Sequence, residues 1–481
     1  MYAITDNFPN IAVSHDDIKK LAPQKKEIYA SISNIDFAQV SSSFGIALHM
    51  HQPTIIDTQD AAHIHRAGLI SNLQYMLEHQ NIGDNHNAPV FLKCYSRISD
   101  IVQDLAAQHK NPRVMLDYSG NLFWGLAQAG EEKVLENLKA VAASDKYHRY
   151  VEWLGTMWSH SVVTSTPIPD IKLHIMAWRK HFSSLFGIEA AKRVKGFSPP
   201  EMHLPIHPDI CFEYIKALKE CGYEWLLVQE HTIENLDGSW IKRPHFPHRL
   251  VAKNSNGETE EIAILIKTKG SDTKLVGQMQ PYAEAKSVGR EDYCGKNLPS
   301  YVSQIGDGEN GGVMMNEFPD AYYRAFNEIE KEGTVSMNGS EYLEFVEKEG
   351  LEEKNFIPVQ PVSQHKIWEI VGKNYHPGAA DEAIKKIHEK DQYFNLDRGS
   401  WTNDKNWVKG YEHVLDPINK LSVAFHSKYG DGFNDGANRK YREALLYLLL
   451  SQTSCFRYWG SGIWTEYAKE ICRRGMMSAL K

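Results

Sequence analysis

Short apolar, β-branched runs alternate with amphipathic stretches along most of the chain. The runs that predict strands are residues 44–49, 90–92, 113–116, 151–154, 193–197, 225–228, 262–266 and 301–305. Apolar residues at helical spacing predict helices between several of them, for example over 134–143 and 210–220. A strand followed by a helix, repeated roughly seven times, is typical of a parallel β/α barrel and not of a sandwich.

The pattern changes at both ends of the predicted barrel. Residues 1–43 lack a convincing buried strand and predict an N-terminal extension with one helix, so the barrel is expected over 44–378. Residues 379–481 predict an all-helical C-terminal region that contributes to the cleft, with an irregular break at 396–404 and the strongest helix at 441–452. The polar, turn-rich stretch 270–297 favours a mobile loop over the cleft.

Composition excludes several classes of function. The chain has 481 residues, enough for a barrel and an added module. Its 53 basic and 61 acidic residues give a net charge of −8 without long blocks of either sign, which argues against nucleic acid or an anionic membrane as partner. Without a signal-peptide core or an apolar run near the ~20 residues that span a bilayer, a cytoplasmic location is expected. Six scattered cysteines predict buried thiols, not a disulfide framework.

Two acidic motifs each follow a predicted strand. Gly-Phe-Ser-Pro-Pro-Glu-Met carries Glu201, and Ile-Gly-Asp-Gly-Glu-Asn-Gly-Gly carries Asp307. Barrel enzymes place their working residues where strands end, so the two carboxyl groups are expected to meet in one cleft. Two facing carboxyl groups are the machinery of glycoside cleavage. Because a single acid more often caps a helix or lies in a solvated turn, this interpretation depends on the motifs that accompany the pair.

Those motifs supply histidine and tryptophan. The first predicted strand ends in His49-Met50-His51-Gln52-Pro53, and a period of two places both imidazoles on one side of the strand. The segment 150–161 adds Trp158 and His160, and Arg-Gly-Ser-Trp near the end of the chain adds Trp401.

Taken in this order, the motifs resemble those of glycoside hydrolase family 57. That family is marked by a His-Gln-Pro element, a Gly-containing element with a downstream His, a Pro-Glu element, an Asp-x-Glu element and a late Gly-Ser-Trp; here they extend from His49 to Trp401. The resemblance implies an incomplete seven-fold β/α barrel followed by helices, without a cofactor or catalytic metal. It also implies that Glu201 is the nucleophile of a glycosyl-enzyme intermediate and Asp307 the general acid/base. Such a retaining pair stands about 5–5.5 Å apart.

The resemblance and the positions of neighbouring residues suggest a set of substrate-binding residues. They are His49, His51, His160, His203, Glu309, Trp158 and Trp401. Imidazoles suit sugar hydroxyls because they both donate and accept hydrogen bonds. Structural roles stay open for these residues. A strand-end histidine is often a core residue, and Trp401 could instead pack between domains. Glu152, a weaker candidate, could simply pair with a neighbouring arginine. Glu309 also competes with Asp307 for the acid role.

Two functions from other classes stay open. His49 and His51 could open a metal-dependent hydrolase site that Asp307 completes, but Gln52-Pro53, the Pro-Glu element and Gly-Ser-Trp have no place in such a site. The second alternative is a non-catalytic glucan-binding protein.

Within the family, the activity depends on loops. Family members include α-amylases, 4-α-glucanotransferases, branching enzymes, amylopullulanases and α-galactosidases. Residues 311–317 lack the aromatic side chains expected of the transferase and branching groups. The sequence is therefore most similar to α-amylase-like members that hydrolyse α-1,4-glucans or maltooligosaccharides, and the oligomeric state stays open.

Overall fold

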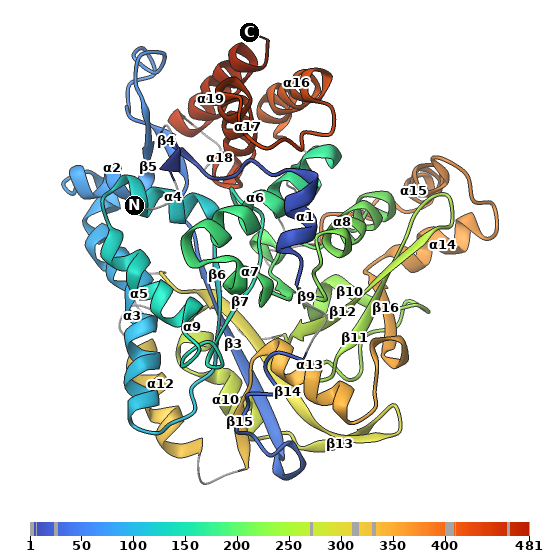
Figure 1. The fold of residues 1–481 in the computed structure, drawn as a ribbon. Coiled ribbons are helices and arrows are strands. Elements are labelled where there is room, and N and C mark those ends of the chain that lie inside the picture. The colour runs from blue at the N-terminus through green and yellow to red at the C-terminus, as the bar shows by residue number, and fades with distance from the viewer. Residues whose placement is uncertain are drawn as a thin grey trace.

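The predicted apolar runs build a ring of parallel strands in a computed structural model of the protein (Figure 1). The structure describes residues 4–5, 7–23, 27–269, 273–309, 317–329, 333–399, 408, 410–458 and 462–480. In chain order, the ring strands are β3 (Ser42–Met50), β6 (Val114–Tyr118), β7 (Val151–Trp153), β8 (Gly196–Phe197), β9 (Trp225–Gln229), β12 (Thr259–Lys267) and β14 (Lys296–Asp307). The last strand, β14, pairs back with β3, which closes the ring.

At two places in the ring, neighbouring segments are paired through a single pair of residues. The segment after β7 meets β8 through one parallel bridge from Gly155 to Phe197, where Gly155 N donates to Gly196 O at 2.9 Å. Between β12 and β14 the pairing is a single pair, Lys267 with Ser303. The described chain thus confirms the predicted seven-fold barrel, which has one strand fewer than the regular eight-fold form.

Helices follow most of the ring strands. They are α2 (Asn72–Glu78) and α3 (Ala88–Ala107) after β3, α4 (Gly120–Gln128) and α5 (Glu132–Ala143) after β6, α6 (Ile168–Phe186) and α7 (Ile188–Lys192) after β7, α8 (Pro208–Glu220) after β8, and α12 (Phe318–Glu328) and α13 (Gly339–Lys348) after β14. A short hairpin of β4 (Thr54–Ile56) and β5 (Leu69–Ser71) precedes α2. The helices predicted at 134–143 and 210–220 are confirmed.

One predicted strand is wrong. Val90, Phe91 and Leu92 lie in the first turns of α3, which has Pro89 near its N-terminus. The buried residues of α3 continue at helical spacing as far as Leu105. A three-residue apolar run cannot by itself distinguish a strand from the first turn of a long amphipathic helix, so the longer period decides the structure.

The sequence did not predict the strands outside the ring, and four of these join the main sheet at its edge or beside β3. They are β10 (Ile233–Asn235), β11 (His248–Lys253), β15 (Thr334–Ser336) and β16 (Ile357–Pro361). β11 pairs antiparallel with β12 and parallel with β16, and β16 pairs antiparallel with β10, so β12 continues from the ring into a side sheet. In β11, buried and half-buried residues alternate. Such a strand carries charged residues on its exposed face and lacks a continuous apolar run.

The expected mobile loop over 270–297 is also corrected. Its described part contains α9 (Thr273–Gly277), α10 (Gln280–Ala285) and β13 (Arg290–Tyr293). β13 pairs with the first residues of β14, which lie at the opposite end of that strand from Asp307. β13 therefore lies at the amino end of β14, away from Asp307.

Helices make up the C-terminal region, as predicted. Within 379–481 they are α15 (Ala379–Lys390), α16 (Glu412–Tyr429), α17 (Arg439–Ser451), α18 (Cys455–Tyr458) and α19 (Ile463–Leu480), and α14 (Gln364–Val371) precedes them in the range predicted for the barrel. Figure 1 shows α16, α17 and α19 together at one end of the molecule, while α14 and α15 form a separate pair. The N-terminal segment carries the short hairpin of β1 (Ile4–Thr5) and β2 (Phe8–Pro9) and one helix, α1 (His15–Leu21), beside α6.

Helix α13 closes the amino end of the barrel with buried polar contacts. Arg113, which precedes β6, donates from Nε and Nη2 to both carboxylate oxygens of Glu341 at 2.8 and 2.9 Å. Ser340 N and Oγ both donate to Glu152 of β7, a fully buried carboxyl group. Glu152 thus has a structural partner on α13, not an arginine. Within the described ranges, no helix combines the length and apolar character needed to cross a bilayer.

Candidate active site

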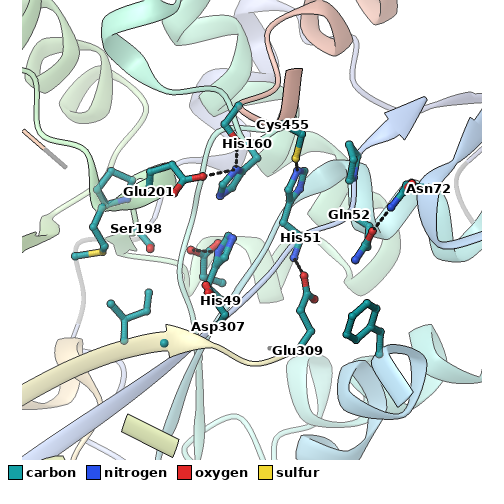
Figure 2. A pocket seen from close by; sticks show the side chains of 18 of the residues that line it. His49, His51, Gln52, Asn72, His160, Ser198, Glu201, Asp307, Glu309 and Cys455 are labelled. Carbon is teal, nitrogen blue, oxygen red and sulfur yellow. Dashed lines mark hydrogen bonds and ion pairs between the residues drawn. The ribbon is translucent and has the colours of Figure 1, made fainter. Parts of the chain in front are cut away.

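A cavity of about 680 Å³ lies where the ring strands end, and every ring strand or the segment after it contributes to its lining. The contributions are His49 from β3 and His51 after it, Asp117 from β6, His160 after β7, Ser198 and Glu201 after β8, Gln229 from β9, Lys267 from β12, and Asp307 from β14 and Glu309 after it. Ser454, Cys455 and Trp464 of the helical region line it too. The cavity is therefore a cleft that the barrel and the C-terminal helices form together (Figure 2).

Glu201 occupies a strained turn beside this cleft. Pro199 and Pro200 fix the backbone after β8, and Glu201 itself adopts φ 58° and ψ 19°, in the left-handed region. Its side chain is 12% exposed, and its Oε1 lies 4.0 Å from Nδ1 of His160. The same His160 nitrogen lies 2.7 Å from Oγ of Ser454. The local sequence thus holds the Glu201 carboxyl group in one direction, toward the histidines.

The predicted histidines come together as a stack. The ring of His160 lies between the other two, with its centroid 4.6 Å from that of His49 and 4.3 Å from that of His51. Burial lowers the pKa of His51 and of His160 well below the usual value, and the charge of neighbouring histidines lowers it further. Both rings are therefore neutral at pH 7, a state in which imidazole donates one hydrogen bond and accepts another.

His49 differs in charge from the other two. Its Nδ1 lies 2.9 Å from Oδ2 of Asp117, which is 1% exposed. Burial alone lowers the pKa of His49, but the charge and hydrogen bond of Asp117, together with Asp307 and Glu309, raise it to about 9. His49 is therefore an imidazolium at neutral pH.

Asp307 at the end of β14 and Glu309 two residues later are both buried acids near His49. Burial raises the pKa of Asp307, and the positive charge of His49 opposes this rise. Burial likewise raises the pKa of Glu309 to about 8, against the opposing effect of His49. Oε1 of Glu309 accepts from the backbone N–H of His51 at 3.2 Å. Asp307 lies beside His49 and Glu309 below His51, as Figure 2 shows.

Two predicted substrate-binding residues do not line the cavity. Trp158 is fully buried and donates from Nε1 to Nδ1 of His181 at 3.2 Å, so it is a core residue. His203 is 4% exposed and bonds to Thr164, with 2.9 Å between Nε2 and Oγ1. Both side chains are thus bonded to other protein groups outside the cavity lining, and their predicted roles in substrate binding stay predictions.

The late Gly-Ser-Trp motif meets the Pro-Glu motif. Leu204, three residues after Glu201, donates from its backbone N to O of Gly399 at 2.6 Å. A Cβ atom on Gly399 would lie 2.3 Å from the Leu204 carbonyl oxygen, so this close approach requires glycine. Trp401 lies outside the described residues, and its predicted stacking role stays a prediction.

Sequence reasoning missed four groups that contact the histidines, which are Asp117, Ser119, Ser454 and Cys455. Asp117 follows the predicted strand 113–116, so its position at a strand end was a readable signal. Ser119 accepts or donates at 2.7 Å from Nδ1 of His51, and Cys455 Sγ lies 3.4 Å from Nε2 of the same ring. The latter contact joins residues 404 positions apart, and no local pattern marks it.

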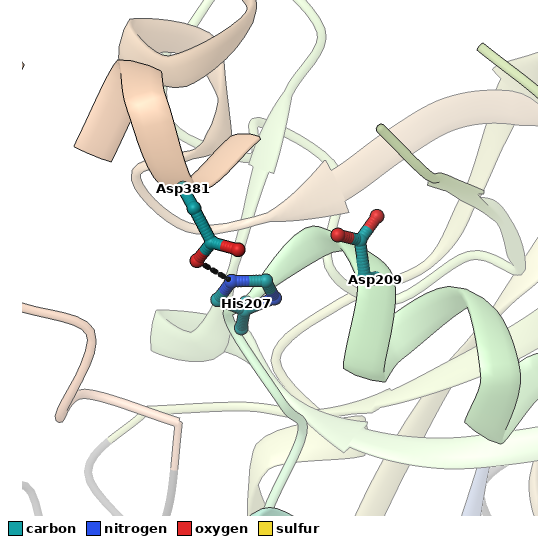
Figure 3. Close-up of side chains that lie close together, drawn as sticks. All are labelled: His207, Asp209 and Asp381. Atoms are coloured by element: carbon teal, nitrogen blue, oxygen red, sulfur yellow. Dashed lines mark hydrogen bonds and ion pairs between the residues drawn. The ribbon is translucent and has the colours of Figure 1, made fainter. Parts of the chain in front are cut away.

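A metal-ligand geometry exists outside the cleft. In the described ranges, His207, Asp209 and Asp381 have ligand atoms within 4.8 Å of one another (Figure 3). Protein groups account for these side chains: Nε2 of His207 lies 3.1 Å from Oδ1 of Asp381, and both oxygens of Asp209 accept from Ser255. The cluster ties the start of α8 to α15 and to the turn between β11 and β12.

Solved structures share this architecture. The chain aligns with the 4-α-glucanotransferase from Thermococcus litoralis at a TM-score of 0.55 and 15% identity, over 92% of this chain and 60% of that one. For the α-amylase AmyC from Thermotoga maritima the values are 0.52 and 10%, over 92% and 93% of the two chains. For the GH57-type branching enzyme from Pyrococcus horikoshii they are 0.50 and 12%, over 91% and 88%.

The protein therefore has the fold of glycoside hydrolase family 57 enzymes, as its motifs predicted. The chain spans about 60% of the length of the glucanotransferase and most of the length of the other two proteins. No family model matches the sequence, and no curated protein matches it either.

Proposed function

We propose that the protein is a retaining α-glycoside hydrolase of family 57 that acts on α-1,4-glucans or maltooligosaccharides. The observation that carries this proposal is that Glu201 and Asp307, from two separate sequence motifs, line one cleft together with His49, His51 and His160. The substrate class is suggested by the proteins that share the fold, which are an amylase, a glucanotransferase and a branching enzyme.

In the first step, a carboxylate oxygen of Glu201 attacks the anomeric carbon from the β face while Asp307 protonates the departing glycosidic oxygen. The bond from the anomeric carbon to that oxygen breaks, and a β-glycosyl ester of Glu201 forms. In the second step, Asp307 takes a proton from water, whose oxygen attacks the anomeric carbon and releases Glu201. Two inversions leave the α configuration unchanged.

The surroundings of each group suit these roles. Burial raises the pKa of Asp307, which favours the protonated form needed in the first step. The neutral ring of His160 can exchange a hydrogen bond with a sugar hydroxyl next to Glu201, whereas both ring nitrogens of His51 contact protein groups, Ser119 and Cys455. An acceptor sugar in place of water would give a 4-α-glucanotransferase or a branching enzyme with the same two acids.

The stacking of the histidines favours glycoside chemistry over metal catalysis. The Nδ1 atoms of His49, His51 and His160 face Asp117, Ser119 and Ser454. His51 and His160 are stacked, and Nε2 of His51 contacts Cys455. Among the described residues, the cluster of side chains with metal-ligand spacing is His207, Asp209 and Asp381, not these histidines. Prolonged chelation should therefore leave turnover unchanged, and activity that disappears on chelation and returns with zinc would establish the metal-dependent hydrolase.

Product analysis tests the proposal directly. Purified protein is incubated with maltooligosaccharides, starch and α-galactosides, and proton NMR follows the anomeric configuration of the first products. We expect α-configured glucose or maltooligosaccharides, and turnover several orders of magnitude lower for Glu201→Gln and Asp307→Asn. Azide should rescue Glu201→Gly and yield the β-glycosyl azide. Absence of turnover on all substrates would instead support a non-catalytic glucan-binding protein.

A further inference from the structure

His49 lies at the centre of a row of three side chains on adjacent strands. In the strand register, Asp307 of β14 is opposite His49 of β3, and His49 is opposite Asp117 of β6. Residues at the same level of neighbouring parallel strands point to the same face of the sheet. All three line the cleft, so the row runs carboxyl, imidazole, carboxyl across its floor.

His49 is the partner that stabilises the buried carboxylate of Asp117. Its Oδ2 accepts from Nδ1 of His49 at 2.9 Å, whereas Oδ1 is buried and has no hydrogen-bond partner within the described chain. A buried carboxylate with one unsatisfied oxygen is costly unless a charge lies beside it. Because Asp117 occupies Nδ1, the nitrogen of His49 that stays open to the cleft is Nε2.

We propose that Asp117 is a positioning residue for the acid/base step: it fixes His49 as an imidazolium beside Asp307, and this charge lets Asp307 serve as base after it has served as acid. The inference rests on the proposed function. A retaining enzyme requires one group to give a proton in the first step and to take one in the second. A fixed cation next to that group stabilises its carboxylate form between the two steps.

The charges around His49 act in the required direction. The groups that face it are the carboxyls of Asp117, Asp307 and Glu309 and the imidazoles of His51 and His160. The carboxyls raise the pKa of His49 to about 9 despite burial. For Asp307, burial raises the pKa, and His49 lowers it more strongly than Asp117 raises it. Loss of the charge on His49 therefore raises the pKa of Asp307 even when Asp117 is lost as well.

The variant Asp117→Asn tests this sign. Asparagine keeps the volume and an acceptor oxygen for Nδ1 of His49 but removes the negative charge. We expect kcat on maltooligosaccharides to fall about 10- to 100-fold, within the range of acid/base effects. The alkaline limb of the pH profile of kcat/KM should move to higher pH by roughly half a unit or more, because Asp307 keeps its proton to higher pH. An unchanged pH profile would overturn the inference.

A matched control separates this role from simple stability. Asp170, which is fully buried, also bonds to a histidine, with 2.7 Å between its Oδ1 and Nε2 of His426, and it lies outside the cleft. Asp170→Asn should lower the melting temperature and leave the pH profile of the folded enzyme unchanged. If it moved the alkaline limb as Asp117→Asn does, the effect would be structural and the inference would fail.

Two further measurements keep the inference independent of activity. In proteins with 15N-labelled histidine, His49 is assigned by its loss in His49→Gln, and its titration is followed by NMR. It should titrate near pH 9 in the wild type and below pH 7 in Asp117→Asn, so that the charge of His49 is lost in the variant. Adding Asp117→Asn to His49→Gln should shift the alkaline limb no further upward. An inactive wild type would refute the proposed function. An active wild type in which His49 has the same pKa as in Asp117→Asn would refute only this inference.

Discussion

Glu201 combines the proposed nucleophile with a backbone conformation that L side chains avoid. Its φ of 58° places it in the left-handed region, and Met202 follows with φ 49°. This conformation costs about 1–2 kcal/mol for a residue with a side chain. Strained backbone collects at functional sites because the surrounding structure holds it there for a chemical purpose. Here it turns the carboxyl group back toward the histidine stack.

The strain has a measurable consequence. Glycine adopts positive φ without steric cost, so Glu201→Gly should be more stable than Glu201→Ala by about 1 kcal/mol. In a protein of this size, that difference corresponds to a melting temperature higher by roughly 1–2 °C. Both variants lack the nucleophile and serve as controls for each other in a thermal unfolding experiment. Equal melting temperatures would show that the turn is relaxed.

Asp307 and Glu309 can be separated by the leaving group. A good leaving group departs without protonation, so loss of the acid harms activated aryl α-glucosides far less than maltooligosaccharides. Asp307→Asn should lower turnover on maltooligosaccharides by about 100-fold or more and on the aryl substrate much less. Glu309→Gln should lower both by a similar factor, since Glu309 braces the backbone of His51. The reverse outcome would assign the acid role to Glu309.

At the level of elements, α13 and β7 share a buried carboxyl group that makes stability depend on pH. Burial raises the pKa of Glu152 to about 8, from an ordinary value of 4.5, although the bonds from Ser340 oppose the rise. Between these two values the folded state binds a proton that the unfolded state has released. The stabilising contribution of Glu152 is therefore complete at low pH and is lost as the pH rises toward about 8.

Glu152→Gln imitates the protonated side chain at every pH. The melting temperature of this variant relative to the wild type should rise as the pH is increased from about 5 to 8, because only the wild type loses stability in that window. Glu341 lies on the same helix, α13, as Ser340, the partner of Glu152. Glu341→Gln breaks the buried pair of Glu341 with Arg113, should lower the stability of the protein by about 3–5 kcal/mol, and serves as the control. A constant difference between Glu152→Gln and the wild type would show that Glu152 folds in its charged form.

The sequence predicted those strands best that are buried on both faces. Strands β3, β9, β12 and β14 were readable because a ring strand is covered on both faces and its apolar run is continuous. The side sheet was missed because β11 alternates buried and half-buried positions and includes His248, Arg249 and Lys253, so it lacks a continuous apolar run. The helix at 88–107 was misread at its first turn, since Val90-Phe91-Leu92 by itself is equally compatible with a strand.

The site was readable where chemistry coincides with a strand end. His49, His51, Glu201 and Asp307 each follow an apolar run, and the cleft contains all four. Asp117 also follows a predicted strand, but which groups pair with which could not be found in this way. The contact of His49 with Asp117 joins residues 68 positions apart, and that of His160 with Ser454 joins residues 294 apart. Such contacts follow from how barrel strands and helices pack, which no local pattern encodes.

For the whole molecule, the C-terminal region completes the cleft as well as covering it. Ser454 and Cys455 bond to His160 and His51, and Trp464 lines the same cavity. The second connection is the bond from Leu204 to Gly399 beside the turn of Glu201. The helical region thus holds the nucleophile turn and the histidine stack from one side, so its separation from the barrel would open the site.

Gly399→Ala tests whether this connection positions the nucleophile. A Cβ at this position would lie 2.3 Å from Leu204 O and 3.2 Å from Nε2 of His203, so the two segments must move apart. Because a displacement near 1 Å at a catalytic group costs about 100-fold in rate, we expect kcat to fall about 10- to 100-fold while melting changes little. Gly289→Ala, whose added methyl group meets no atom within 4 Å, should keep normal kinetics. If Gly399→Ala also kept normal kinetics, the barrel alone would set the direction of Glu201, and the proposed contribution of residues 379–481 to the cleft would reduce to the contacts of Ser454 and Cys455.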